Sequence, residues 1–109
     1  MMTYINILIL LILAHFVADF VLQNDRMAVE KCPGKDVVLH WTWWMAGHTA
    51  LHGLFVAVIT GIPLLGLAEW IIHFAIDYGK CGGYYNLGMD QASHIFCKML
   101  WVAFLYDTL

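Results

Sequence analysis

Four long apolar stretches, separated by short polar connections, dominate the pattern of the chain. They cover about Thr3–Gln23, Trp41–Thr60, Ile62–Tyr78 and Leu87–Tyr106. An apolar run of about 20 residues is long enough to span a bilayer as a helix. The pattern therefore predicts an all-α, integral membrane bundle of four transmembrane helices in up-down order, forming a single domain over residues 1–109.

The breaks between these stretches contain residues typical of helix ends. Gly61 is suited to end the second helix, and Pro63 is suited to the first turn of the third. Glycines follow the third stretch at Gly79 and at the pair Gly82-Gly83. Asn86 precedes the fourth stretch and is a good N-terminal cap for it.

The basic residues of the connections predict the orientation of the bundle. Arg26, Lys31 and Lys35 lie in the first connection and Lys80 in the third, whereas the second connection and both termini have none. Cytoplasmic loops are enriched in Lys and Arg. We therefore expect a multi-pass membrane protein whose first and third connections lie in the cytoplasm and whose termini both lie outside it.

Composition supports a membrane protein and excludes several other classes. Hydrophobic residues make up 62% of the chain, charged residues 12%, and the mean hydropathy is +0.76, whereas soluble domains have about 25% charged residues. A net charge of −3 makes nucleic acid an unsuitable partner. The three cysteines show no CxxC spacing, so we expect reduced thiols and no disulfide framework.

Each apolar stretch carries two polar residues that are four positions apart. Such i, i+4 residues share one face of a helix. The pairs come in chain order, one per stretch: His15 and Asp19, His48 and His52, His73 and Asp77, Asp90 and His94. With the predicted orientation, all eight lie in the cytoplasmic half of the membrane, where an up-down bundle brings them to one level of its core.

Five imidazoles and three carboxylates at one level are a suitable set of metal ligands. His and Asp favour a divalent transition metal, zinc first, with manganese, iron or nickel as alternatives. Eight donors exceed the four that tetrahedral zinc takes, so either two ions bind or some groups orient the ligands. A single pair is more simply explained as a hydrogen bond between helices, but four pairs at matched depth favour a functional site.

Several other polar residues lie near this set. Glu69 and Lys98 are one helical turn from His73 and His94, and we expect Glu69 to pair with Lys98 or to hold a ligating histidine. His40 precedes the tryptophan cluster and is interpreted as an interfacial residue outside the site. Gln91 is assigned to a neighbouring face, and Cys97 is interpreted as a small buried hydrophobic residue.

The segments "AHFVADFVLQNDRMAVEK", "HTALHG", "HFAIDYGK" and "DQASH" together resemble a family of small bacterial and phage inner-membrane proteins classed as domain of unknown function 3307. The resemblance covers nearly the whole chain. The chain also looks more distantly similar to inner-membrane proteins described as metal-dependent hydrolases. By position, the resemblance implies the same eight residues as the metal set.

Three functions fit these observations. The first is a metal-dependent hydrolase acting on a membrane lipid headgroup or a small phosphorylated substrate, with Asp19, Glu69 or Asp90 as catalytic residue. The second is a metal or proton transporter, for which a homodimer would supply more helices. The third is a membrane interaction protein in which the metal only holds a small bundle together.

Overall fold

The computed structural model describes residues 3–108, and all the regular structure in that range is helical. The elements are α1 (Tyr4–Phe16), a π-helical turn η1 (Val17–Val21), α2 (Asp25–Glu30), α3 (Trp41–Thr60), α4 (Pro63–Cys81) and α5 (Leu87–Thr108). The prediction of an all-α protein is confirmed. Of these elements, the short helix α2 and the π-helical turn were not predicted.

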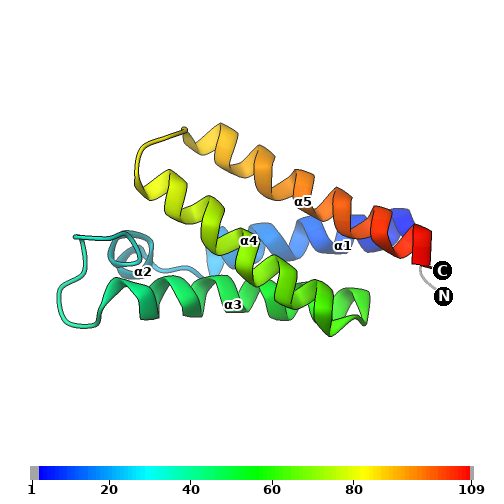
Figure 1. Cartoon of the computed structure of the whole chain (residues 1–109), viewed down its shortest axis with the longest axis horizontal. Coiled ribbons are helices and arrows are strands. Elements are labelled where there is room, and N and C mark those ends of the chain that lie inside the picture. Colours follow the sequence, from blue (N-terminus) through cyan, green and yellow to red (C-terminus); the bar gives the residue numbers. More distant parts are fainter. Residues whose placement is uncertain (1–2, 109) are drawn as a thin grey trace.

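The four long helices run alternately up and down along the molecule, which measures 46 × 23 × 21 Å. Both ends of the described chain lie at one end of the molecule, where α1 and α5 run side by side, and α2 lies at the other end (Figure 1). The buried apolar core lies towards the end with the termini. It consists of Leu11, Val56, Leu65, Cys97, Trp101 and Leu105. The buried polar and charged side chains lie mainly in the opposite half of the interior.

The helix ends follow the predicted signals. Asn86 caps α5, because its side-chain oxygen accepts a hydrogen bond from the backbone N–H of Met89 at 2.8 Å. Gly61 ends α3 with a φ of 73°, a left-handed conformation that glycine adopts without steric cost. Pro63 lies in the first turn of α4. Helix α4 continues past Tyr78 to Cys81, because the backbone N–H groups of Gly82 and Gly83 bond back to its last carbonyls.

Two glycines let α3 and α4 approach very closely. A Cβ atom added to Gly53 would lie 2.7 Å from the carbonyl oxygen of Gly66, and one added to Gly66 would lie 2.6 Å from the carbonyl oxygen of Gly53. Small residues facing each other in this way are typical of packed helices in membranes. The crossing sets the distance between the two helices that carry four of the predicted metal ligands.

Glu30 links helix α2 to the loop that follows it. This side chain is only 4% exposed, accepts a hydrogen bond from the backbone N–H of Val37 at 2.8 Å, and pairs with Arg26 one turn earlier. The Val37 N–H and the Arg26 guanidinium together lower the pKa of Glu30. Glu30 therefore connects α2 to the loop that leads into α3.

A disulfide joins Cys32, just after α2, to Cys81 at the end of α4, with a Cα–Cα distance of 5.3 Å. The expectation of reduced thiols is therefore wrong for these two residues. They are 49 positions apart, so no local spacing reveals the bond, which depends on α2 folding back onto α4. Cys97 is a free, buried thiol within the apolar core, as predicted.

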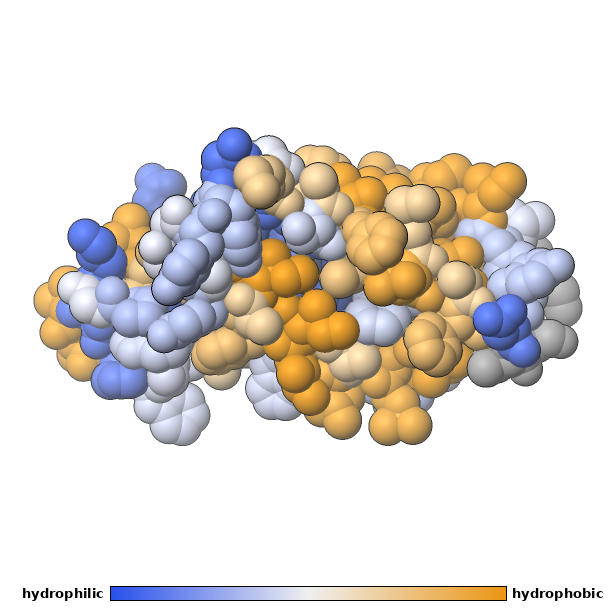
Figure 2. Space-filling model, turned by 45° about the horizontal axis from the view of Figure 1, so that its top comes forward, coloured by the Kyte–Doolittle hydropathy of each residue, from blue (hydrophilic) through white to orange (hydrophobic). Residues whose placement is uncertain are grey.

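Among residues 3–108, one helical segment, Tyr4–Val21, is long and apolar enough to cross a membrane by length and composition alone, with a mean hydropathy of 2.2. The surface adds a second observation. Figure 2 shows apolar residues covering most of the length of one face, while hydrophilic residues gather mainly at the end that carries α2. Exposed apolar side chains occur on all four long helices, among them Leu13, Leu54, Ile71 and Phe104.

Candidate metal centre

The structure brings all eight predicted residues into one buried cluster in the polar half of the bundle. Each of the eight is at most 8% exposed. The cluster draws on every long element: His15 from α1, Asp19 from η1, His48 and His52 from α3, His73 and Asp77 from α4, and Asp90 and His94 from α5. The four i, i+4 pairs thus face a common interior, as the pattern predicts.

Asp19 is one of two carboxylates around which the cluster is built. One of its oxygens lies 2.8 Å from Nε2 of His52 and 3.2 Å from Nε2 of His48. The other oxygen accepts a hydrogen bond from the side-chain amide of Gln91 at 2.8 Å. Asp19 lies within the π-helical turn, and such turns are frequent at functional sites. The widened turn sets the position of Asp19 among the residues of α3 and α5.

Asp77 is the second such carboxylate. One oxygen lies 2.9 Å from Nε2 of His94, and the other accepts a hydrogen bond from Nζ of Lys31 at 3.1 Å. Nε2 of His48 lies 3.3 Å from Asp77, and Nε2 of His73 lies 3.5 Å from it. Asp77 therefore joins the histidines of three helices to a lysine that follows α2.

The imidazole rings lie against one another in the centre of the cluster. His73 stacks between His52, at 3.7 Å between ring centroids, and His94, at 3.8 Å. Nε2 of His73 has no hydrogen-bond partner among the described residues, and the same is true of Nε2 of His48. Buried nitrogen atoms normally have a partner. Two imidazole nitrogens that make no hydrogen bond, beside two carboxylates, suit a bound cation.

The donor atoms form three overlapping groups in which every atom lies within 4.8 Å of the others. The groups are Asp19, His48, His52 and His73; His73, Asp77 and His94; and Asp19, Asp90 and His94. The first matches the four ligands of a tetrahedral zinc site in number and in type. The residues present therefore fit a divalent transition metal.

His15 is the predicted ligand that belongs to none of these three groups. Its Nε2 atom lies 2.8 Å from the side-chain oxygen of Gln91 and 3.6 Å from Asp19. Gln91 in turn donates to Asp19 and to Asp90. This geometry suits His15 and Gln91 to orienting the carboxylates, as outer partners of metal ligands commonly do.

Gln91 is expected on a helix face next to that of Asp90, yet its long side chain reaches the cluster and donates to Asp19 and Asp90. The residue is three positions before His94, a spacing that also places two side chains on one side of a helix. Applying the i, i+3 rule to α5 as well as the i, i+4 rule would have brought Gln91 into the site.

Glu69 and Lys98 form an ion pair one turn beyond the cluster. Glu69 is 0% and Lys98 1% exposed, and Nζ of Lys98 donates to Oε1 of Glu69. The other oxygen of Glu69 lies 3.4 Å from Nδ1 of His73. The predicted pairing of Glu69 with Lys98 is therefore present, whereas Glu69 approaches His73 without a hydrogen bond. His40 is exposed and caps α3, outside the cluster, as expected.

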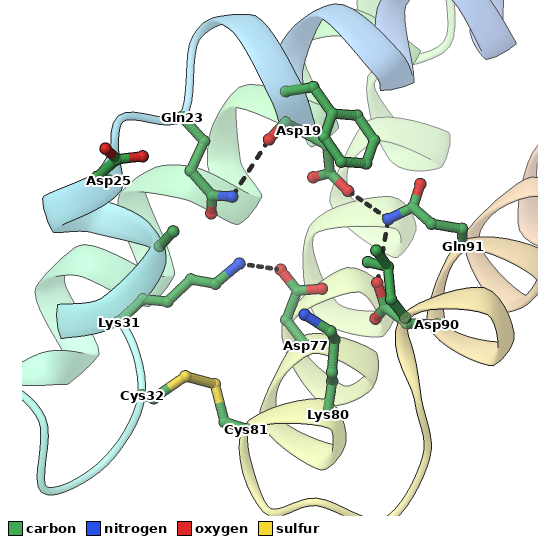
Figure 3. A pocket seen from close by; sticks show the side chains of 13 residues that line it. Asp19, Gln23, Asp25, Lys31, Cys32, Asp77, Lys80, Cys81, Asp90 and Gln91 are labelled. Carbon is green, nitrogen blue, oxygen red and sulfur yellow. Dashed lines mark hydrogen bonds and ion pairs between the residues drawn. A yellow bond between two sulfur atoms is a disulfide. The ribbon is translucent and has the colours of Figure 1, made fainter.

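A cavity of about 490 Å³ opens beside the cluster at the end of the molecule that carries α2. Figure 3 shows its polar side chains converging from α2, η1, α4 and α5. Asp19, Asp77 and Asp90 line the cavity, together with Lys31 and Lys80. Of the three predicted catalytic residues, Asp19 and Asp90 therefore face this space, whereas Glu69 is not among its lining residues.

The fold and the cluster define a class of helical proteins with a buried His/carboxylate centre that opens into a polar pocket. Residues 7–108 match the family described as Protein of unknown function (DUF3307), and the chain belongs to this family. No curated protein and no solved structure matches the chain. The expected family is thereby confirmed.

Proposed function

We propose that this protein is an integral membrane, metal-dependent hydrolase that acts on a lipid headgroup or a small phosphorylated molecule. One observation carries the proposal: a compact His/Asp ligand set lies directly beside a polar cavity of about 490 Å³. A metal that only holds helices together needs no such space. A catalytic centre needs room for substrate next to its ligands.

The membrane part of the proposal is supported by the surface of the bundle. Apolar side chains project outward from all four long helices, and the 46 Å length of the molecule suits a bilayer that is about 40–45 Å thick with its headgroups. The hydrophilic end with α2 (Figure 2) would lie at the membrane surface. The pocket would then open at the level of lipid headgroups.

The residues have separate roles in the proposed reaction. Asp19, His48, His52 and His73 would hold one divalent ion, and Asp77 and His94 supply donors for a second. When bound, a metal of this kind acts as a Lewis acid and makes water a stronger nucleophile at neutral pH. Asp90 lines the pocket and is held by Gln91 at 3.1 Å, which positions its carboxylate to accept a proton from water.

Transport through the bundle has weaker support. Beyond the cluster, the Glu69–Lys98 pair fills the interior, with the indole N–H of Trp101 3.4 Å from Glu69. The apolar core follows directly. A path for ions would have to pass both layers, whereas the pocket already gives the cluster access from one side.

The proposal is tested by the metal content of detergent-purified protein. We expect one or two equivalents of zinc or a related metal in the wild type and a loss of that metal in a His48→Ala/His52→Ala variant. His40→Ala is the matched control, because His40 is exposed and outside the cluster, and it should keep its metal. A folded wild type that binds no metal after zinc or manganese is added would refute the proposal.

Activity is then measured on the metal-loaded protein with soluble phosphomonoesters and with phospholipids in nanodiscs. We expect Asp90→Asn to keep its metal and to lose most of its turnover, since general base catalysis typically contributes about 10²–10⁴-fold. Full turnover in this variant would remove Asp90 from the proposed mechanism. If the metal-loaded wild type hydrolyses none of these substrates, the proposed hydrolase activity is refuted.

A further inference from the structure

The wall of the pocket beside Asp77 of the His/Asp cluster carries two lysines on separate elements. Lys31 follows α2, and Lys80 lies in the last turn of α4. Their side chains enter the same space from these two elements (Figure 3). Lys31 is well covered, with a side chain only 12% exposed, and it contacts Asp77 of the cluster. Neither lysine is used by the proposed metal centre.

Each of these lysines directly precedes a half-cystine. The sequence reads Lys31-Cys32 on one segment and Lys80-Cys81 on the other, and the disulfide between the two cysteines holds their Cα atoms 5.3 Å apart. A covalent bond one residue away from each lysine fixes both backbones relative to each other. The disulfide therefore keeps two ammonium groups at the same side of the pocket, facing the carboxylates.

The net charge of the pocket determines whether an anion can bind there. Its lining includes four aspartates, Asp19, Asp25, Asp77 and Asp90, against the two lysines. This leaves an excess of two negative charges, which a single divalent cation in the cluster cancels. A second divalent cation leaves an excess of two positive charges, which attracts an anion to the lysines. Lysine is a common phosphate-binding residue because it offers a compact positive charge.

We propose that Lys31 and Lys80 form a phosphate-binding subsite in this pocket, and that the Cys32–Cys81 disulfide holds the two lysines in place. The ligand is the phosphoryl group of a phosphoester, which lies between the lysines and the metal centre. This inference rests on the proposed function, because the cluster must hold its cation before the anion can enter. The phosphoryl group is thus the part of the substrate that the two lysines recognise.

The test is the binding of inorganic phosphate to zinc-loaded, detergent-purified protein, measured by calorimetry. We expect a Lys31→Gln/Lys80→Gln variant to bind phosphate at least about tenfold more weakly, because it loses both ammonium groups that the subsite offers to the anion. Lys35→Gln is the matched control, since Lys35 is exposed and is not among the lining residues. Lys31→Arg/Lys80→Arg should restore most of the affinity.

Zinc content is measured on the same samples, so that the two proposals fail separately. Wild type that holds zinc but binds phosphate no better than Lys31→Gln/Lys80→Gln overturns the subsite alone. Wild type that holds no zinc overturns the subsite and the hydrolase together. Loss of zinc from the lysine variant with retained phosphate affinity also overturns the subsite, because the anion would then bind elsewhere.

The role of the disulfide is tested by reduction and by a Cys32→Ser/Cys81→Ser variant. We expect both to bind phosphate several-fold more weakly while they keep their zinc. Unchanged phosphate affinity would show that packing alone positions the lysines, and that part of the proposal would fall.

The source of the phosphoryl group is distinguished by competition. Glycerol 3-phosphate represents a soluble phosphomonoester, and phosphatidic acid in nanodiscs represents a lipid headgroup, with phosphatidylcholine nanodiscs as control. Displacement of inorganic phosphate by the first or the second identifies the source and supports the subsite. Displacement by neither overturns the assignment to phosphoesters.

Discussion

At the scale of single residues, the interior of this bundle is ordered in layers. The His/Asp cluster is followed by the Glu69–Lys98 pair, and then by an apolar core that includes Trp101. A charge within an apolar interior is costly unless it is paired. Lys98 and Glu69 compensate each other, and Glu69 also approaches His73, so this pair connects the cluster to the core.

Replacing Lys98 by methionine should destabilise the protein strongly. The substitution leaves the carboxylate of Glu69 buried without its cation, and breaking a buried pair in this way typically costs about 3–5 kcal/mol. A Glu69→Gln/Lys98→Met variant removes both charges and should recover a large part of the loss. Unfolding in detergent, followed by tryptophan fluorescence, measures both. A Lys98→Met protein as stable as wild type would contradict this account.

The residues that could be predicted from the sequence are those whose partners lie on regular helices. His73 and Asp77 share a face whatever surrounds the helix, and so do Asp90 and His94, because the spacing alone decides it. Lys31 could not be predicted as a partner of Asp77. That contact depends on how the connection after α2 folds back, and no periodic pattern describes such a segment.

At the scale of elements, the crossing of α3 and α4 is set by two residues without side chains. The facing backbones at Gly53 and Gly66 leave no space for a Cβ atom. Three of the four ligands on these two helices, His48, His52 and His73, lie within about two turns of the crossing. A change in the distance between the helices therefore changes the distance between the ligands.

Gly66→Ala should destabilise the protein and weaken metal binding. The added Cβ would lie 2.6 Å from the Cβ atom of Ala57, and overpacking of this kind costs about 1–3 kcal/mol. The control is Gly47→Ala, also in a long helix, where a Cβ would meet nothing within 4 Å. That variant should be neutral or gain about 0.5–1 kcal/mol, since alanine is the better helix former. Thermal unfolding compares them, and equal stability of the two variants would argue against close packing at the crossing.

The long helices could be predicted and the short ones could not. Long apolar runs bounded by residues such as Gly61 and Pro63 leave little choice of structure. Helix α2 has six residues in a polar connection, and it depends on its last residue, Glu30, whose carboxylate accepts a hydrogen bond from the backbone of the following loop. The predicted end of α4, Tyr78, lies before the observed end, because Gly79 alone does not stop a helix whose last carbonyls still find hydrogen-bond partners.

At the scale of the whole molecule, two signals for the orientation of the proposed membrane protein oppose each other. The Lys and Arg residues of the connections favour a cytoplasmic position for the end with α2. The Cys32–Cys81 disulfide lies at that same end, and disulfides persist mainly in oxidising compartments such as the periplasm. The redox state of these cysteines in cells decides between the two orientations.

We expect the disulfide to be present in cells, because the fold holds the two cysteines within bonding distance. Cells are lysed with a thiol-blocking reagent, and free thiols that appear only after reduction are labelled with a maleimide polymer. Two labels after reduction, from Cys32 and Cys81, would place the pocket on the oxidising side. The same two labels should persist in a Cys97→Ser variant. If all the cysteines react with the blocking reagent before reduction, the disulfide is absent in cells, and the cytoplasmic orientation of the pocket is favoured.

The π-helical turn at Val17–Val21 makes this protein sensitive to chain length at one point. Each residue of an α-helix turns the chain by about 100°. Deleting one residue before Asp19 would restore regular α-helical hydrogen bonding, yet it would swing that carboxylate away from His52 and Gln91. In evolutionary terms, the exposed positions of this turn, Val17, Phe20 and Val21, should accept substitutions more readily than the turn accepts an insertion or a deletion. The number of residues in the turn, together with Asp19 itself, sets the geometry of the centre.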